Sequence, residues 1–187
     1  MFHIAALVGP FHPYPLYEKI NYQGTLNLVE ACKRHSVRKF VCAGTPSTRM
    51  HGGDMMGEPH DTLTIPKPGK FAARYAETKA MAELALRDLV SDSFLPITVA
   101  PHQVYGPRDF LFLPNLLNTM RTNRLRIFGN GQNKIDVCHV DNYCHGLIIA
   151  EQQLYPGSPC LGKFYLVTDE EPQLFWKLLD SAGHHMG

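Results

Sequence analysis

Tyr75 and Lys79 are the residues of this chain whose types and spacing most clearly suggest chemistry. They stand four residues apart in a stretch, 71–89, that favours a helix, so both side chains share one helical face. A lysine ammonium beside a phenol favours the phenolate, and the pair could accept and return a proton near neutral pH. The spacing alone is a weak signal, because Tyr and Lys meet in this way by chance in many helices.

The segments around this pair alternate between short apolar runs and helical periodicity. We expect strands at 2–8, 39–43, 96–100, 126–128, 135–138 and 164–167, and helices at 17–35, 71–89, 113–124 and 140–153. Segments 9–15 and 45–70 are rich in Pro, Gly and polar residues and are expected to be loops. Alternating strands and helices indicate a parallel sheet covered on both faces, with chemistry beyond the carboxyl ends of the strands.

Composition narrows the class of protein. The chain has 187 residues, 44% of them apolar, and a formal net charge of +1, which indicates one globular domain without a nucleic-acid partner. No apolar run reaches the roughly 18 residues of a membrane span. Five cysteines without a C-x-x-C pair indicate reduced thiols. Ten histidines include no H-x-x-x-H pair, so we expect no metal site.

Several segments, in order along the chain, resemble motifs of the extended short-chain dehydrogenase/reductase family. They match its H-x-A-A strand end, N-x-x-G-T-x-N helix, catalytic Ser/Thr slot, Y-x-x-x-K pair, P-x-x-V-Y-G-P segment and later [YH]-V-x-N/D-V segment. The corresponding residues are Phe2–Ala6, Asn21–Asn27, Thr45, Tyr75–Lys79, Pro101–Arg108 and His139–Asn142. The resemblance covers nearly the whole chain, and it implies an α/β fold of the NAD(P)-binding Rossmann type, with a doubly wound parallel sheet.

The resemblance also implies roles for individual residues. Tyr75 would be the acid/base that exchanges a proton with a secondary alcohol, assisted by Lys79. Thr45 would bind the substrate oxygen, and Asn21 would support a water chain to the lysine. NAD or NADP would contact a set made of Ala5, Ala6, Tyr75, Lys79, Pro101 and Val104. Arg108 would meet the substrate or a cofactor phosphate; alternatively it caps a turn, just as Asn21 alternatively acts as a capping or turn-forming residue.

Within that family, the segment 133–146 most resembles the branch of 3β-hydroxysteroid and sterol-carboxylate dehydrogenases. Nucleotide-sugar epimerases usually carry an Arg there, whereas this chain has Lys134, Ile135 and Asp136. The resemblance implies a sterol- or steroid-like small-molecule substrate, with a nucleotide-sugar epimerase or reductase as the lesser alternative. The apolar run 110–113 either flanks such a substrate or fills the core. We further expect a homodimer, and a cytoplasmic protein that associates with the endoplasmic reticulum in a full-length form.

The family's Gly-rich phosphate loop, G-x-x-G-x-x-G, does not occur in this sequence. The order of motifs places 2–6 at the family's fourth strand, so we expect an N-terminally truncated Rossmann domain. Its sheet-and-helix core would comprise 1–107 and 139–153, and its substrate-side elements 108–138 and 154–187. We expect the chain alone to bind NAD(H) weakly or not at all, with an exposed apolar edge at 2–6. A catalytically inactive fragment that acts as an interaction module therefore stays open as an alternative.

Overall fold

The computed structural model describes residues 1–9, 11–50, 64–127, 129–169 and 171–186, and the chain divides into two compact units. The first unit comprises Met1–Ala100 and Gly146–Leu166, and the second comprises Pro101–His145 and Val167–Gly187. The expected division into a core of 1–107 and 139–153 and substrate-side elements of 108–138 and 154–187 stays a prediction. The second segment of the first unit ends at Leu166 and so includes most of the strand at 164–167.

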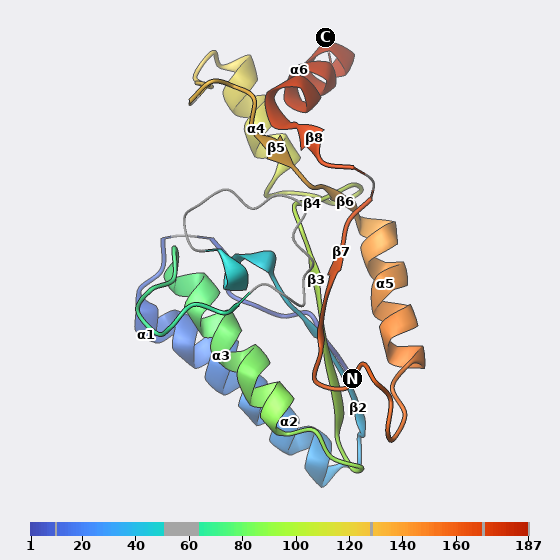
Figure 1. The fold of residues 1–187 in the computed structure, drawn as a ribbon. Helices are drawn as coiled ribbons and strands as arrows, with labels where there is room; N and C mark the ends of the chain where they lie inside the picture. Colours follow the sequence, from blue (N-terminus) through green and yellow to red (C-terminus); the bar gives the residue numbers. More distant parts are fainter. Residues whose placement is uncertain (10, 51–63, 128, 170, 187) are drawn as a thin grey trace. The chain divides into compact units, whose positions relative to one another are not determined.

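A four-stranded sheet organises the first unit (Figure 1). Its strands are β1 (Phe2–His3), β2 (Lys39–Ala43), β3 (Leu95–Pro101) and β7 (Phe164–Val167), in the order β1-β2-β3-β7. β1 pairs with β2 in parallel and β2 with β3 in parallel, with Val41 opposite Ile97. β2 and β3 are apolar without alternation because both of their faces are buried.

Helices cover the sheet and contribute buried apolar side chains to its core. Three helical segments follow one another without a break: α1 (Tyr14–Tyr17), the π-helix η1 (Glu18–Gln23) and α2 (Gly24–Arg34). The helix α3 (Arg74–Asp88) lies beside them (Figure 1). A core cluster joins α2, β2, α3 and the start of β3. Its buried members are Val29, Cys32, Phe40, Cys42, Leu86 and Phe94. Figure 1 shows α5 (Val140–Gln152) on the other side of the strands.

The second unit is built from short pieces. β4 (Val104–Tyr105) pairs in parallel with β6 (Cys138–His139), and β5 (Lys134–Ile135) pairs antiparallel with β8 (Gln173–Leu174). Two helices complete it, α4 (Leu113–Arg121) and α6 (Phe175–Met186). No helix of the described ranges has both the length and the apolar character needed to cross a membrane.

The expected parallel α/β sheet is confirmed, and β2 and β7 have the predicted bounds. Other predictions of secondary structure were wrong. The strand expected at 2–8 covers only Phe2–His3, and 126–127 is not a strand, while residue 128 is outside the described part. The segment 135–138 is divided between β5 and β6.

The first helical stretch begins earlier than predicted, at Tyr14, because a proline in the first turn is compatible with a helix. Part of the expected loop 45–70 is a short 3₁₀ helix, η2 (Pro46–Arg49). Residues 51–63 of that loop lie outside the described residues.

Candidate active site

Lys79 is held against the carboxyl end of β2. It lies on α3, its side chain is buried, and its Nζ donates a hydrogen bond to the Ala43 carbonyl oxygen at 2.7 Å. Ala43 is the last residue of β2, and the sheet ladder continues past it through the Gly44 N–H, which donates to the Val99 carbonyl. A buried ammonium needs such a partner, so the lysine is fixed at this edge of the sheet.

Tyr75 lies one turn before Lys79 on the same helix and is half-buried. Burial is the largest influence on its phenol, and a hydrogen bond with Thr45 acts in the opposite direction; the net result is a raised pKa. The expected lowering of this pKa by Lys79 is therefore wrong for the protein without a ligand. Burial disfavours the charged phenolate, and it is the largest influence on this group.

Thr45 lies two residues after the end of β2 and is the N-cap of η2. Its Oγ1 accepts a hydrogen bond from the Ser47 backbone N–H at 3.3 Å and donates to the Ser47 hydroxyl at 3.2 Å. The Thr45 side chain also acts on the Tyr75 phenol of α3 and lowers its pKa, which places this turn next to Tyr75. The structure thus brings together Thr45, Tyr75 and Lys79, three of the four predicted catalytic residues.

Asn21, the fourth, is buried inside the π-helix η1 rather than at a helix end, so the capping alternative is wrong. Its Oδ1 accepts from the Leu7 N–H at 2.8 Å, and its Nδ2 donates to the Leu7 carbonyl at 3.1 Å. The same amide reaches the Thr78 hydroxyl at 3.4 Å, next to Lys79. π-Helical turns are frequent at functional sites. This one lets a single side chain connect the segment after β1 with α3.

Ala5 and Ala6 were predicted to contact a cofactor. They lie after β1 and just before Leu7, whose backbone is bonded to Asn21. Ala5 is exposed and Ala6 is half-buried. Both side chains are small, and their expected contact with a cofactor stays a prediction. The given sequence contains no Gly-rich loop, the element that binds a dinucleotide pyrophosphate at a helix N-terminus.

The remaining predicted contacts belong to the second unit. Pro101 ends β3, Val104 lies in β4, and Arg108 is exposed with a φ of 69°. Their expected roles toward cofactor and substrate stay predictions. Among the residues that the structure describes, no group of three His, Cys, Asp or Glu side chains could hold a metal ion.

Two features of the site were not predicted from the sequence. Gly44 precedes Thr45, and a Cβ there would come within 2.6 Å of the Thr98 methyl group and 3.2 Å of the Phe164 ring. Arg49 and Glu83 form a buried ion pair between η2 and α3. Glu83 could have been found, since it lies four residues after Lys79 on the same helical face. Nothing in the sequence around Arg49 indicated burial.

Comparison with known proteins identifies the family of this chain and relatives of similar sequence. The model of the 3-beta hydroxysteroid dehydrogenase/isomerase family matches residues 1–187. The chain is 33% identical to a 2-alkyl-3-oxoalkanoate reductase of Stenotrophomonas maltophilia, over 98% of this chain and 56% of that protein. It is 32% identical to the human sterol-4-alpha-carboxylate 3-dehydrogenase, over 96% of this chain and 48% of that enzyme. The chain thus spans about half the length of the curated relatives it matches.

Solved structures confirm the Rossmann-type fold. A UDP-N-acetylglucosamine 4-epimerase from Methanobrevibacter ruminantium superposes with a TM-score of 0.80 at 20% identity, covering 99% of this chain and 59% of that one. An NAD complex of dTDP-glucose 4,6-dehydratase from Bacillus anthracis gives 0.74 at 18% identity, covering 100% and 57%. At this identity the likeness concerns the fold alone. The family match over residues 1–187 shows that the chain belongs to the 3-beta hydroxysteroid dehydrogenase/isomerase family.

Proposed function

We propose that this chain is the catalytic part of an NAD(P)-dependent oxidoreductase that interconverts a secondary alcohol and a ketone on a sterol-like substrate. The observation that carries the proposal is the meeting of Thr45, Tyr75 and Lys79 at the carboxyl end of β2. Family membership supports the same class of reaction.

Each of the three residues would have one task. In the direction of oxidation, the Tyr75 oxygen takes the hydroxyl proton while the carbinol carbon loses its hydride. The nicotinamide ring supplies the hydride acceptor and, when oxidised, a positive charge that favours the phenolate. The Thr45 hydroxyl binds the substrate oxygen and stabilises charge that develops on it. In the reductive direction, Tyr75 gives its proton to the ketone oxygen, and its raised pKa keeps that proton in place at neutral pH.

The cofactor would be NAD or NADP, held on the nicotinamide side by Lys79, Tyr75 and the backbone at Ala5 and Ala6. Pro101 and Val104 are the predicted contacts from the second unit. Lys79 is well suited to bind ribose hydroxyls, because an ammonium offers three donors and the Ala43 carbonyl takes one of them.

The relatives' names narrow the substrate. A sterol-4-alpha-carboxylate 3-dehydrogenase and a 2-alkyl-3-oxoalkanoate reductase both act at a C3 oxygen whose neighbouring carbon bears a carboxylate. We therefore favour a 3-hydroxy or 3-oxo lipid with a carboxylate on the adjacent carbon, in ring or chain form. We propose the exposed guanidinium of Arg108, which was expected to meet the substrate or a cofactor phosphate, as the partner of that carboxylate.

The test is a substrate panel on the longest product of the gene, monitored by absorbance of the reduced nicotinamide. The panel pairs a 3β-hydroxysterol that carries a 4-carboxylate with the same sterol lacking it, and adds a 2-alkyl-3-oxo acid and a nucleotide sugar. Turnover of the carboxylated compounds, with strong preference over the plain sterol, is expected. Turnover of the nucleotide sugar alone would contradict the proposal.

A further inference from the structure

The turn that carries Thr45 is tied to α3 by a buried ion pair. Both terminal nitrogens of the Arg49 guanidinium contact the Glu83 carboxylate, Nη1 at Oε2 and Nη2 at Oε1. The guanidinium also lies 3.5 Å above the centre of the Phe164 ring on β7. Arg49 is 6% exposed and Glu83 8%. A two-point fork stacked on an aromatic face is a geometry that arginine makes and lysine does not.

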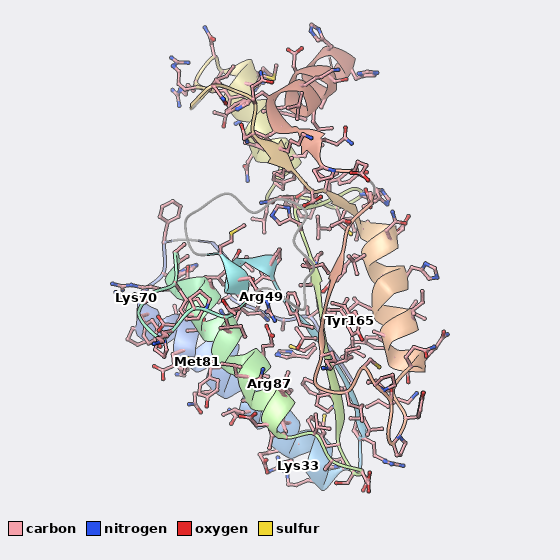
Figure 2. All side chains as sticks on the ribbon, in the orientation of Figure 1. Lys33, Arg49, Lys70, Met81, Arg87 and Tyr165 are labelled. Atoms are coloured by element: carbon pink, nitrogen blue, oxygen red, sulfur yellow. The ribbon has the colours of Figure 1, made fainter. Side chains whose placement is uncertain are left out.

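A hydrogen-bonded chain leads from this ion pair to Thr45. Nη1 of Arg49 donates to the Thr48 hydroxyl, and that hydroxyl in turn donates to the Thr45 carbonyl oxygen at 2.9 Å. The Thr48 hydroxyl also lies 3.5 Å from Oε2 of Glu83. The position of Thr45 therefore depends on β2 on one side and on the Arg49 fork on the other. Figure 2 labels Arg49 on the turn after β2.

The fork ends on the helical face that carries the chemistry. Glu83 lies four residues after Lys79 and eight after Tyr75, so all three project from one side of α3. A buried ion pair is in general weak support for stability, because desolvation offsets the Coulomb attraction. What this pair adds is a defined distance between the Thr45 turn and the Tyr75 face.

We propose that Arg49 is a positioning residue that acts through Glu83 and Thr48 to hold the Thr45 hydroxyl against Tyr75. Its consequence for turnover rests on the proposed function, whereas its consequence for the geometry of the Thr45–Tyr75 pair does not. The hydrogen bonds of Arg49 in the described part of the chain go to Thr48 and Glu83, so its effect on the Thr45–Tyr75 pair passes through these two residues.

The experiment reads the Tyr75 phenol directly in the full chain. 3-Fluorotyrosine replaces all tyrosines, the Tyr75 signal in ¹⁹F NMR is identified from its loss in Tyr75→Phe, and its pKa is measured by titration. Arg49→Lys keeps the charge and removes the fork. We expect it to raise the pKa of Tyr75 in the same direction as Thr45→Val, and Arg49→Lys combined with Thr45→Val to raise it no further than Thr45→Val alone. An unchanged Tyr75 pKa in folded Arg49→Lys, or fully additive shifts, would overturn the proposal.

A second variant protects the test from loss of folding. Arg49→Met combined with Glu83→Leu replaces the ion pair by apolar side chains, a change that buried pairs often tolerate. We expect its circular dichroism and urea midpoint to stay near those of the parent chain, while the pKa of Tyr75 rises as in Thr45→Val. Lys33→Ala, which breaks the exposed Glu30–Lys33 pair on α2, is the control and should change nothing. A parent-like Tyr75 pKa in the folded double variant would overturn the proposal.

Turnover separates this inference from the proposed function. In an active enzyme the double variant should lose roughly 100-fold in kcat, because a small misplacement of a reacting group is costly, with little change in the KM for the cofactor. If the parent enzyme turned over no alcohol while the Tyr75 pKa still responded to Arg49, the proposed function would fail and the positioning role would stand.

Discussion

The two units of this chain differ in what they bury. The first unit encloses charged groups, Lys79 and the Arg49–Glu83 pair, and its core cluster is at most 2% exposed. In the second unit, α4 buries no residue, and Phe110 and Leu111 just before it are 80% and 70% exposed. Its strands are two residues long, apart from the last residues of β3 and β7.

This contrast fits a division of tasks. Groups that exchange protons need fixed geometry, and Tyr75 and Lys79, to which we assign that task under the proposed function, lie on a packed helix beside the sheet. Residues that select a substrate can be carried on less tightly packed segments, where sequence change costs little stability. Substitutions in the first unit should therefore change rate or stability strongly, and matched substitutions in the second unit should change them weakly.

The largest effect is expected for Tyr75→Phe. Removing the phenol hydroxyl takes away the proton donor, and we expect turnover to fall by about 10²- to 10⁴-fold with cofactor binding largely intact. Steady-state kinetics and a cofactor titration check this. Tyr14→Phe, which loses a hydroxyl 3.6 Å from the Met81 sulfur, is the matched control and should stay near the parent rate. Retained turnover in Tyr75→Phe would exclude Tyr75 as the acid/base.

The next largest difference is expected in stability, when a leucine of each unit is shortened to alanine. Leu86 is 1% exposed in the core cluster of the first unit, so Leu86→Ala should lower the free energy of unfolding by about 2–5 kcal/mol. Leu111→Ala, at an exposed position of the second unit, should change it by no more than about 0.5 kcal/mol. Urea denaturation of both variants measures the difference. Equal losses would remove the contrast between the units.

Mild acid should destabilise the first unit through His3. Burial, followed by the charge of Lys79, lowers the pKa of His3 from 6.5 to about 4, and its Nε2 shares a hydrogen bond with the Thr25 hydroxyl at 2.8 Å. The unfolded chain takes up this proton near pH 6.5, so the stability is complete above that pH and falls between 6.5 and about 4.

Between pH 7 and 5, this histidine should lower the free energy of unfolding by about 1–2 kcal/mol. Urea midpoints of the parent chain and His3→Gln at the two pH values isolate that contribution, because the other histidines are common to both. An identical pH dependence in the two proteins would show that His3 is not held neutral.

The smallest effect is expected at Asp169 in the second unit. Burial raises the pKa of this carboxyl, but hydrogen bonds from Asn142, His139 and Tyr105 outweigh it and the net pKa is lowered. The stability from these bonds is therefore present above the unfolded pKa of about 3.9 and is lost as the pH falls through the lower folded value. Asp169→Asn should cost about 1 kcal/mol at neutral pH. Hydrogen exchange at the His139 backbone amide should accelerate in this variant. Unchanged exchange would show that the Asp169 carboxylate does not protect that amide.

The sequence predicted well those elements that are decided by local pattern. β2 and β7 are short apolar runs with clear boundaries, and α3 carries Tyr75 and Lys79 on one face as their spacing requires. The direction of the Tyr75 pKa was predicted wrongly, because spacing shows the ammonium and not the burial. The Arg49–Glu83 pair was missed for a related reason: a charged residue reads as solvent-exposed until its distant partner is known. The contacts of Asn21 with Leu7 likewise depend on tertiary packing.

The most direct test of the proposed chemistry follows hydride and proton together. The longest product of the gene is given NADH or NADPH deuterated on the transferred position and a 3-oxo acid, and the product alcohol is analysed by mass spectrometry for the parent enzyme and Tyr75→Phe. We predict deuterium on the carbinol carbon with the parent enzyme and near-complete loss of labelled product with Tyr75→Phe. Equal labelling by both proteins would contradict the assignment of Tyr75, and an unlabelled alcohol would contradict hydride transfer from the nicotinamide.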